Sequence, residues 1–240
     1  RQKLIERTVD LVFKATGKHI PVWNTETGFV QPSRIDGRPM DEEQFQKKYK
    51  GKPATEAGAR MITEHRAACW EAQSHLLDLA AGAEKVFLHA GFGISTVRGD
   101  GIYRQQRLPT EKGVAYAAMA KVVNKKDKIR ILRIDLGNPE SAGILIAGKG
   151  EDNTVVLFAD EEFDAYFPVS EDKEFHGMDF LGNPLTLNSE NRLLRIKVGM
   201  EPIYIFDVPE DFHGVQILNV RSESKISRDS AAKGEITVTN

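Results

Sequence analysis

Glu26 is the residue of this sequence whose type and position best suit chemistry. It ends a short run, residues 19–26, that begins apolar and becomes polar, and Gly28 follows where the backbone can turn sharply. In an α/β barrel the carboxyl ends of the strands face the active site, and a carboxylate there suits a nucleophile or a general base. A helix-capping or surface glutamate is the alternative, and position alone leaves both open.

Other patterns that could carry chemistry are weaker. Residues 91–96 begin like a dinucleotide-binding loop, but Thr96 replaces the third glycine and no helical pattern follows. His65 and His75 lie ten residues apart on one helical pattern, near opposite sides of it, without a third ligand nearby. The single cysteine, Cys69, excludes an internal disulfide and a cysteine-based zinc site, and its surroundings favour a buried thiol. We therefore expect no metal site and no nucleotide cofactor.

The composition excludes two classes of partner. The chain has 240 residues, with 33 Lys and Arg against 35 Asp and Glu, for a formal net charge of −2. Without an excess of positive charge there is no field to attract a phosphate backbone, so nucleic-acid binding is not expected. The longest apolar runs have fewer than ten residues, which is too short to cross a bilayer, so no membrane partner is expected.

The first half of the chain alternates helical and strand patterns. Apolar residues recur at helical spacing over 4–15 and 57–77, and Thr110 is the expected N-cap of a third helix. Residues 19–26 and 85–90 are expected to form strands, and the second is a continuous apolar run typical of a parallel strand buried on both faces. The order helix–strand–helix–strand–helix predicts parallel strands joined by helical crossovers.

The second half has the pattern of an antiparallel β-sandwich. Leu194, Ile196 and Val198 alternate with Arg195 and Lys197, which indicates one buried and one solvated face. Several short strands at such spacing, separated by turn signals, are typical of a sandwich. The expected strands are 129–136, 143–147, 154–158, 165–169, 193–198 and 203–206.

We predict three parts: an α/β part in residues 1–126, a β-sandwich in 127–213, and in 214–240 a linker and the start of a further β module. The first part poses a physical problem, because two parallel strands with three helices leave each strand short of neighbours. Both ends of the sequence look cut. We therefore expect more chain, or another chain, to supply the missing strands.

Four segments, in order along the chain, carry a resemblance to a known enzyme family. Residues 21–28, Pro-Val-Trp-Asn-Thr-Glu-Thr-Gly, are similar to the seventh-strand segment of clan A glycoside hydrolases, whose fold is a (β/α)8 barrel. Residues 71–87 resemble the seventh helix and eighth strand of that barrel, and 109–123 resemble its last helix. Residues 179–185, followed by 200–205, look like the β-domain appended to many such enzymes.

The resemblance, which covers residues 1 to about 208, implies an α/β plus all-β fold. That fold is the C-terminal portion of a (β/α)8 TIM barrel, carrying strands seven and eight, followed by an antiparallel β-sandwich. It also implies retaining hydrolysis, in which Glu26 attacks the anomeric carbon while a second acid protonates the leaving oxygen. In the family that acid ends the fourth strand, which has no match here. We therefore expect the parent to be a glycosidase, this chain alone to be inactive, and no cofactor to be needed.

The resemblance further suggests residues that contact the sugar. Trp23 and Asn24 precede Glu26, and His89 and Phe92 end and follow the eighth strand. The family often has an aromatic residue at the position of His89, so Phe92 is the candidate to replace it. Core packing is the alternative for Trp23, and a structural role is the alternative for His89.

The expected partners are a poly- or oligosaccharide and the remaining N-terminal part of the barrel, in the same or a companion chain. Such enzymes usually act outside the cytoplasm, so a secreted or periplasmic location is expected. A non-catalytic carbohydrate-binding or spacer β-sandwich is the alternative function. A binder would need an exposed row of aromatic residues on one sheet, for which Tyr166, Phe167, Phe175 and Phe180 are available, although their spacing suits core packing equally well.

Overall fold

The computed structural model of the protein describes two sets of elements. The residues described are 2–27, 34–35, 38–39, 43, 47, 63–88, 108–124, 130–134, 136, 141–148, 153–209 and 212. The first set is α1 (Gln2–Thr16), β1 (Trp23–Thr27), β2 (Arg34–Ile35), β3 (Arg38–Pro39), α3 (Glu64–Ala80), β4 (Lys85–Leu88) and α5 (Glu111–Asn124). The second set is β5 (Arg130–Ile134), β6 (Ser141–Ala147), β7 (Thr154–Ala159), β8 (Phe163–Pro168), β9 (Glu174–Met178), β10 (Pro184–Asn188), β11 (Leu193–Val198) and β12 (Ile203–Phe206).

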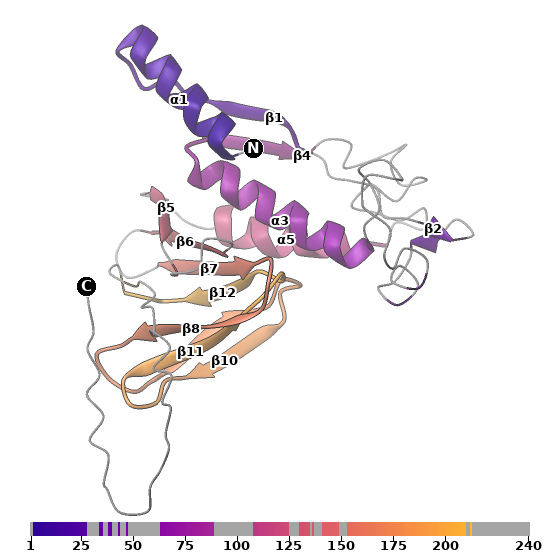
Figure 1. Ribbon diagram of the computed structural model, residues 1–240, viewed down its shortest axis with the longest axis vertical. Helices are drawn as coiled ribbons and strands as arrows, with labels where there is room; N and C mark the ends of the chain where they lie inside the picture. Colours follow the sequence, from indigo (N-terminus) through magenta and orange to yellow (C-terminus); the bar gives the residue numbers. More distant parts are fainter. Residues whose placement is uncertain are drawn as a thin grey trace, which may run out of the picture.

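These elements are stacked in layers (Figure 1). β1 and β4 form a two-stranded parallel sheet, and α3 and α5 lie side by side between it and a six-stranded antiparallel sheet of order β10-β9-β12-β7-β6-β5. The antiparallel pair β8–β11 covers the other face of the large sheet. None of the helices in the described residues is both long and apolar enough to cross a membrane.

The central strands of the large sheet are buried on both faces. In β7, Val156 and Phe158 pack with α3 and α5, whereas Val155 and Leu157 pack toward β8 and β11. This two-sided burial explains why β6 and β7 are apolar at almost every position rather than at alternate ones. β11 alternates as predicted, with Leu194, Ile196 and Val198 buried.

Several sequence-based expectations are confirmed at the level of single elements. β1 and β4 pair in parallel, and the Thr110 hydroxyl accepts a hydrogen bond from the backbone N–H of Gly113 at 3.1 Å, as an N-cap does. The strands β9 and β10 are not among the expected ones. Gly177 interrupts the apolar pattern of β9, and Pro184, which suggests a turn, occupies the first position of an edge strand, where proline is tolerated.

Three of the four aromatic residues considered for a sugar-binding row belong to the core. Phe167, Phe175 and Phe180 are 0%, 2% and 3% exposed, and Tyr166 is half-buried. Phe167 and Phe175 lie in the core between the two antiparallel sheets, and Phe180 packs against α3 and α5. These residues therefore provide no exposed aromatic row.

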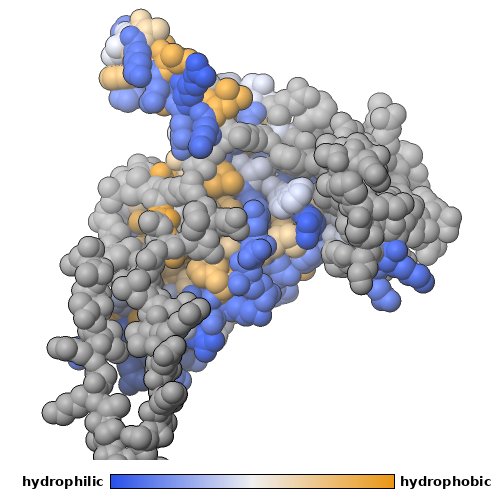
Figure 2. Space-filling model, viewed as in Figure 1, coloured by the Kyte–Doolittle hydropathy of each residue, from blue (hydrophilic) through white to orange (hydrophobic). Residues whose placement is uncertain are grey.

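The parallel sheet differs from the sequence-based expectation. Residues 85–90 predict a strand buried on both faces, but Phe87 in β4 is 44% exposed and Trp23 in β1 is 51% exposed. The reason is that α3 covers one face of this sheet and no described residue covers the other. Apolar side chains also lie on the surface of α1, among its charged ones (Figure 2). The large exposed apolar side chains of the described residues all lie in the first 108 residues: Leu4, Leu11, Phe13, Ile20, Trp23, Phe87 and Leu108.

His65 links α3 and α5 to the turn between β11 and β12. From the first turn of α3, its Nδ1 lies 2.6 Å from Oε1 of Glu111 on α5, and its Nε2 lies 3.1 Å from Oε1 of Glu201 in the β11–β12 turn. The ring packs edge-on against Phe180, with centroids 5.1 Å apart. Hydrogen bonds with the Cys69 sulfur and the Glu111 carboxylate raise the pKa of His65 from its usual 6.5 to about 10.

This raised pKa makes the stability of the junction depend on pH. Because the folded state binds the His65 proton more tightly than the unfolded state, the stabilisation is complete below about pH 6.5 and is lost as the pH rises toward 10. We expect the difference in urea midpoint between wild type and His65→Gln to shrink over that range. The groups facing His65 are Cys69, Glu111 and Glu201. A midpoint difference that does not change with pH would contradict the charged link.

Gly177 is required because two backbones approach closely at β9 and β12. A Cβ on Gly177 would collide with the carbonyl oxygen of Tyr204. We expect Gly177→Ala to lower the free energy of unfolding by about 1–3 kcal/mol, as measured by urea denaturation. The matched control is Gly199→Ala, whose Cβ would meet only the flexible side chain of Glu162, with an expected change within about 0.5 kcal/mol. Equal effects of the two substitutions would refute the steric argument.

Candidate functional site

β1 is irregular between Asn24 and Thr27, the segment that contains Glu26. Asn24 pairs with Val86 and Thr27 pairs with Leu88, so three residue steps in β1 lie opposite two steps in β4. This register shift, with one extra residue in β1, has the form of a β-bulge and lies in the segment that contains Glu26. Bulges are rare in parallel pairs and occur often beside active sites, where they redirect a side chain.

Helix α3 holds the strand on both sides of this bulge. The side-chain amide of Asn24 donates to Oδ2 of Asp78 at 2.6 Å, and Thr27 Oγ1 lies 3.1 Å from Nε2 of His75. His75 and Asp78 are three residues apart, and so are neighbours on the helix surface. Residues three apart in a regular strand point to opposite faces, so the extra residue is what allows both Asn24 and Thr27 to face α3.

The Thr27 hydroxyl connects β1, β4 and α3. It donates to the carbonyl oxygen of Phe87 at 2.9 Å, and because a hydroxyl has one proton, His75 Nε2 must donate to it. The other ring nitrogen, Nδ1, lies 3.0 Å from the backbone oxygen of Glu71 and 3.3 Å from its Oε1, which are both acceptors. Each ring nitrogen of His75 therefore faces an oxygen atom, one on β1 and one on α3.

A buried ion pair supports His75 from the side of α5. Glu71 is 0% exposed, and its Oε2 lies 3.2 Å from Nζ of Lys112, which is 3% exposed. Charges buried in this way are costly unless they are paired, and the Lys112 ammonium group provides the opposite charge for the Glu71 carboxylate. A continuous buried network thus runs from Lys112 through Glu71 and His75 to Thr27, directly after Glu26.

The other face of the parallel sheet carries two exposed aromatic rings. Trp23 precedes Asn24 and therefore lies on the face that α3 does not cover. Its ring centroid is 6.0 Å from that of Phe87, and Nζ of Lys85 lies 4.6 Å from the Trp23 ring. Aromatic faces of this kind suit the apolar side of a sugar ring as well as core packing.

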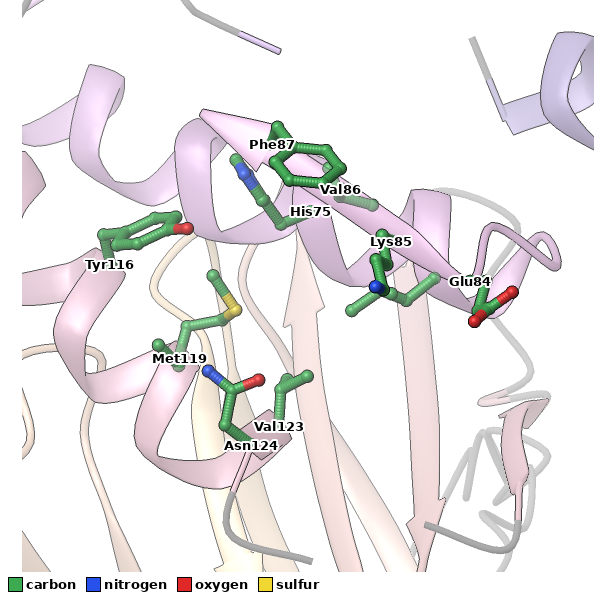
Figure 3. A pocket seen from close by; sticks show the side chains of 11 residues that line it. His75, Glu84, Lys85, Val86, Phe87, Tyr116, Met119, Val123 and Asn124 are labelled. Atoms are coloured by element: carbon green, nitrogen blue, oxygen red, sulfur yellow. The ribbon is translucent and has the colours of Figure 1, made fainter. Parts of the chain in front are cut away.

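A pocket of about 320 Å³ lies between β4, α3 and α5 (Figure 3). His75 and Tyr116 line one end, with their rings edge-on and 5.2 Å apart, and Phe87, Met119 and Asn124 also line it. The pocket follows the edge of β4 that has no paired strand among the described residues. Within the described part of the chain, no group of three or more His, Cys, Asp or Glu side chains is arranged to hold a metal ion.

The structure places some of the predicted site residues and leaves others outside its description. Trp23 and Asn24 lie on β1 beside Glu26, which belongs to the same strand. The side chain of Glu26, and the whole of His89 and Phe92, lie outside the described residues. The roles of all five residues stay predictions.

The buried network is not among the features predicted from the sequence, although the sequence contains a signal for it. Glu71, His75 and Asp78 recur at intervals of four and three, which places three polar residues on one side of a helix otherwise rich in small and apolar residues. A polar stripe on a buried helix indicates that it packs against polar groups on another element. Phe87 was also missed, because only the register of β1 with β4 places it beside Trp23.

Comparison with known proteins gives a match in structure alone. No protein-family model matches the chain, and no curated protein matches it in sequence. The chain is similar to a family 39 glycoside hydrolase from the gut symbiont Bacteroides cellulosilyticus WH2, with a TM-score of 0.57 and 14% identity over 86% of this chain and 38% of that chain. Its similarity to the catalytic domain of GH30 xylanase C from Talaromyces cellulolyticus has a TM-score of 0.48 and 10% identity, over 80% and 42% of the two chains.

The similarity to the family 39 structure confirms the predicted resemblance to glycoside hydrolases at the level of the fold. At 14% identity it is a likeness of fold alone. The chain spans less than half the length of either solved structure.

Loss of Lys112 tests the buried network. We expect Lys112→Met to lower the free energy of unfolding by about 3 kcal/mol, because Glu71 would lose a partner in a site without solvent. Adding Glu71→Gln to Lys112→Met should restore part of that loss. The control is Lys197→Met, which removes a solvent-exposed partner of Glu162 and should leave the urea midpoint unchanged. Equal midpoints for Lys112→Met and the control would contradict a buried ion pair.

Proposed function

We propose that this chain is the C-terminal part of a retaining glycoside hydrolase. Residues 1–126 form the end of a (β/α)8 catalytic barrel, residues 127–213 an antiparallel β-sandwich, and residues 214–240 a linker and the start of a further β module. The observation that carries the proposal is Glu26 in a bulge at the carboxyl end of a parallel strand. The fold similarity to a family 39 glycoside hydrolase supports it.

In the proposed reaction Glu26 is the nucleophile. Its carboxylate attacks the anomeric carbon while an acid from another part of the barrel, about 5–5.5 Å away, protonates the leaving oxygen. The same acid, now a base, then takes a proton from water, and the oxygen of that water attacks the anomeric carbon and releases Glu26. No cofactor takes part, since the two carboxylates supply both the nucleophile and the proton.

The substrate is a poly- or oligosaccharide that binds at the carboxyl end of β1, where Glu26 lies. Trp23 is exposed on the face of the sheet that α3 does not cover and forms, with Phe87, an aromatic surface near that end. His89 and Phe92 complete the proposed contacts, whereas the side-chain amide of Asn24 donates to Asp78 on α3 and orients the strand. As such enzymes usually act outside the cytoplasm, we propose a secreted or periplasmic location.

The second partner is the N-terminal part of the barrel, in the same or a companion chain. Parallel sheets are normally buried on both faces, whereas one face of β1–β4 is uncovered among the described residues. On α1, Leu4 and Leu11 are 67% and 53% exposed, so the uncovered apolar surface extends beyond the sheet. Further barrel strands and helices would bury these side chains, and without them the chain alone lacks an acid/base and should be inactive.

Substitution of Glu26 in the longer protein tests the function. We expect Glu26→Ala to abolish the hydrolysis of a panel of 4-nitrophenyl glycosides, because no carboxylate then attacks the anomeric carbon. Sodium azide should restore turnover of the variant by attacking in place of Glu26, and the glycosyl azide should have the anomeric configuration opposite to the substrate. The far-ultraviolet circular dichroism should not change.

The matched control is Glu84→Ala, which removes an exposed glutamate immediately before β4. Its hydrolysis rates should equal those of the unmodified protein. Undiminished turnover by Glu26→Ala would exclude Glu26 as the nucleophile. A longer protein without activity on any glycoside of the panel would count against the hydrolase itself.

A further inference from the structure

We propose that Thr27 with His75, and Asn24 with Asp78, form a bulge clamp that positions Glu26 for reaction. The inference rests on the proposed function, because it takes Glu26 as the nucleophile. The four residues are positioning residues, since they act through the backbone of β1 and not on the substrate. The clamp joins the strand to the helix by one hydrogen bond before the bulge and one after it.

A bulged strand end needs such support. The extra residue in a bulge leaves the ladder of backbone hydrogen bonds locally disrupted. Within the described residues β1 pairs with one neighbour, β4, so its backbone conformation depends on few contacts. A reacting carboxylate must be held to within about 0.5 Å of its productive position, and neighbouring groups must supply that precision.

The side chain of Thr27 is held by hydrogen bonds to both β4 and α3. Thr27 is 1% exposed, its hydroxyl donates to Phe87, and it accepts from a histidine that is 2% exposed. His75 in turn is oriented by the Glu71 backbone oxygen and carboxylate at its other nitrogen. Rotation of the Thr27 or His75 side chain away from this geometry would break a buried hydrogen bond.

The buried polar groups that contact the clamp indicate that it positions Glu26 and does not mainly add stability. Replacing a buried ion pair with apolar residues of similar volume is often neutral or stabilising, so stability alone does not explain a buried Lys112–Glu71 pair beside a buried histidine. Lys112, Glu71 and His75 supply directional contacts instead, and these converge on the residue next to Glu26. Asp78, 1% exposed, supplies the corresponding contact at Asn24.

The test compares Thr27→Val with Thr27→Ser. Valine has the same shape but cannot bond to His75 or Phe87, whereas serine keeps the hydroxyl. On this chain, amide hydrogen exchange of residues 25–27 should become at least ten-fold faster in Thr27→Val and stay near wild type in Thr27→Ser. In the longer protein, with the 4-nitrophenyl glycoside that it hydrolyses fastest, Thr27→Val should lower kcat at least ten-fold with KM within two-fold, and Thr27→Ser should restore most of kcat.

A second pair of variants tests the contact that His75 makes from α3. His75→Gln keeps a donor that can reach Thr27, whereas His75→Leu removes it, so His75→Leu should show the larger change in exchange and in kcat. The control is His176→Gln on β9, an exposed histidine whose replacement should alter neither readout.

The outcomes separate the clamp from the function. Unchanged exchange in both Thr27→Val and His75→Leu overturns the clamp, whatever the activity. Faster exchange with kcat no lower than in His176→Gln shows that the contacts are structural only, which also overturns it, while Glu26 keeps its proposed role. Full turnover by Glu26→Ala overturns the proposed function, and the positioning role with it.

Discussion

The hydrogen bond between Thr27 and His75 is the contact on which the arrangement of the parallel sheet depends. It joins the end of β1 to α3, and through the Thr27 hydroxyl it also joins β1 to β4. The helix is itself packed on its opposite side by apolar contacts of Ala72 and Leu76 with the large sheet and α5. The end of β1 is therefore held by α3, and α3 is held by the apolar core that it forms with α5 and the large sheet.

Helix α3 packs on the large sheet through apolar contacts, but it contacts β1 through hydrogen bonds. Apolar packing is non-directional and tolerates small shifts, so it suits the attachment of the helix to a broad sheet. Hydrogen bonds between buried groups require defined distances and angles, so they suit the strand end that contains Glu26. Directional contacts also occur at the N-terminal end of α3, where His65 bonds to Glu111 on α5 and to Glu201 in the β11–β12 turn.

Local features were accessible from the sequence because they depend on neighbouring residues. Helical spacing located α1, α3 and α5, the Thr110 cap followed from residue type, and the apolar run at 85–88 indicated β4. β9 and β10 could not be found in the same way, because Gly177 and Pro184 carry signals for turns. The strand conformation of β9 is stabilised by pairing with β12, which is a contact between distant segments, and β10 pairs in turn with β9.

The sequence by itself determined the order of helices and parallel strands, the change to short antiparallel strands, and Glu26 as the chemical candidate, because periodicity and residue type are local properties. Only the tertiary structure decided the bulge at Glu26, since a bulge exists relative to a partner strand and register is set by the pairing of β1 with β4. It likewise decided the partners of His75, of which Thr27 is 48 residues away in sequence. A buried polar side chain must find its hydrogen bond wherever folding brings a partner, and no local pattern specifies which residue that is.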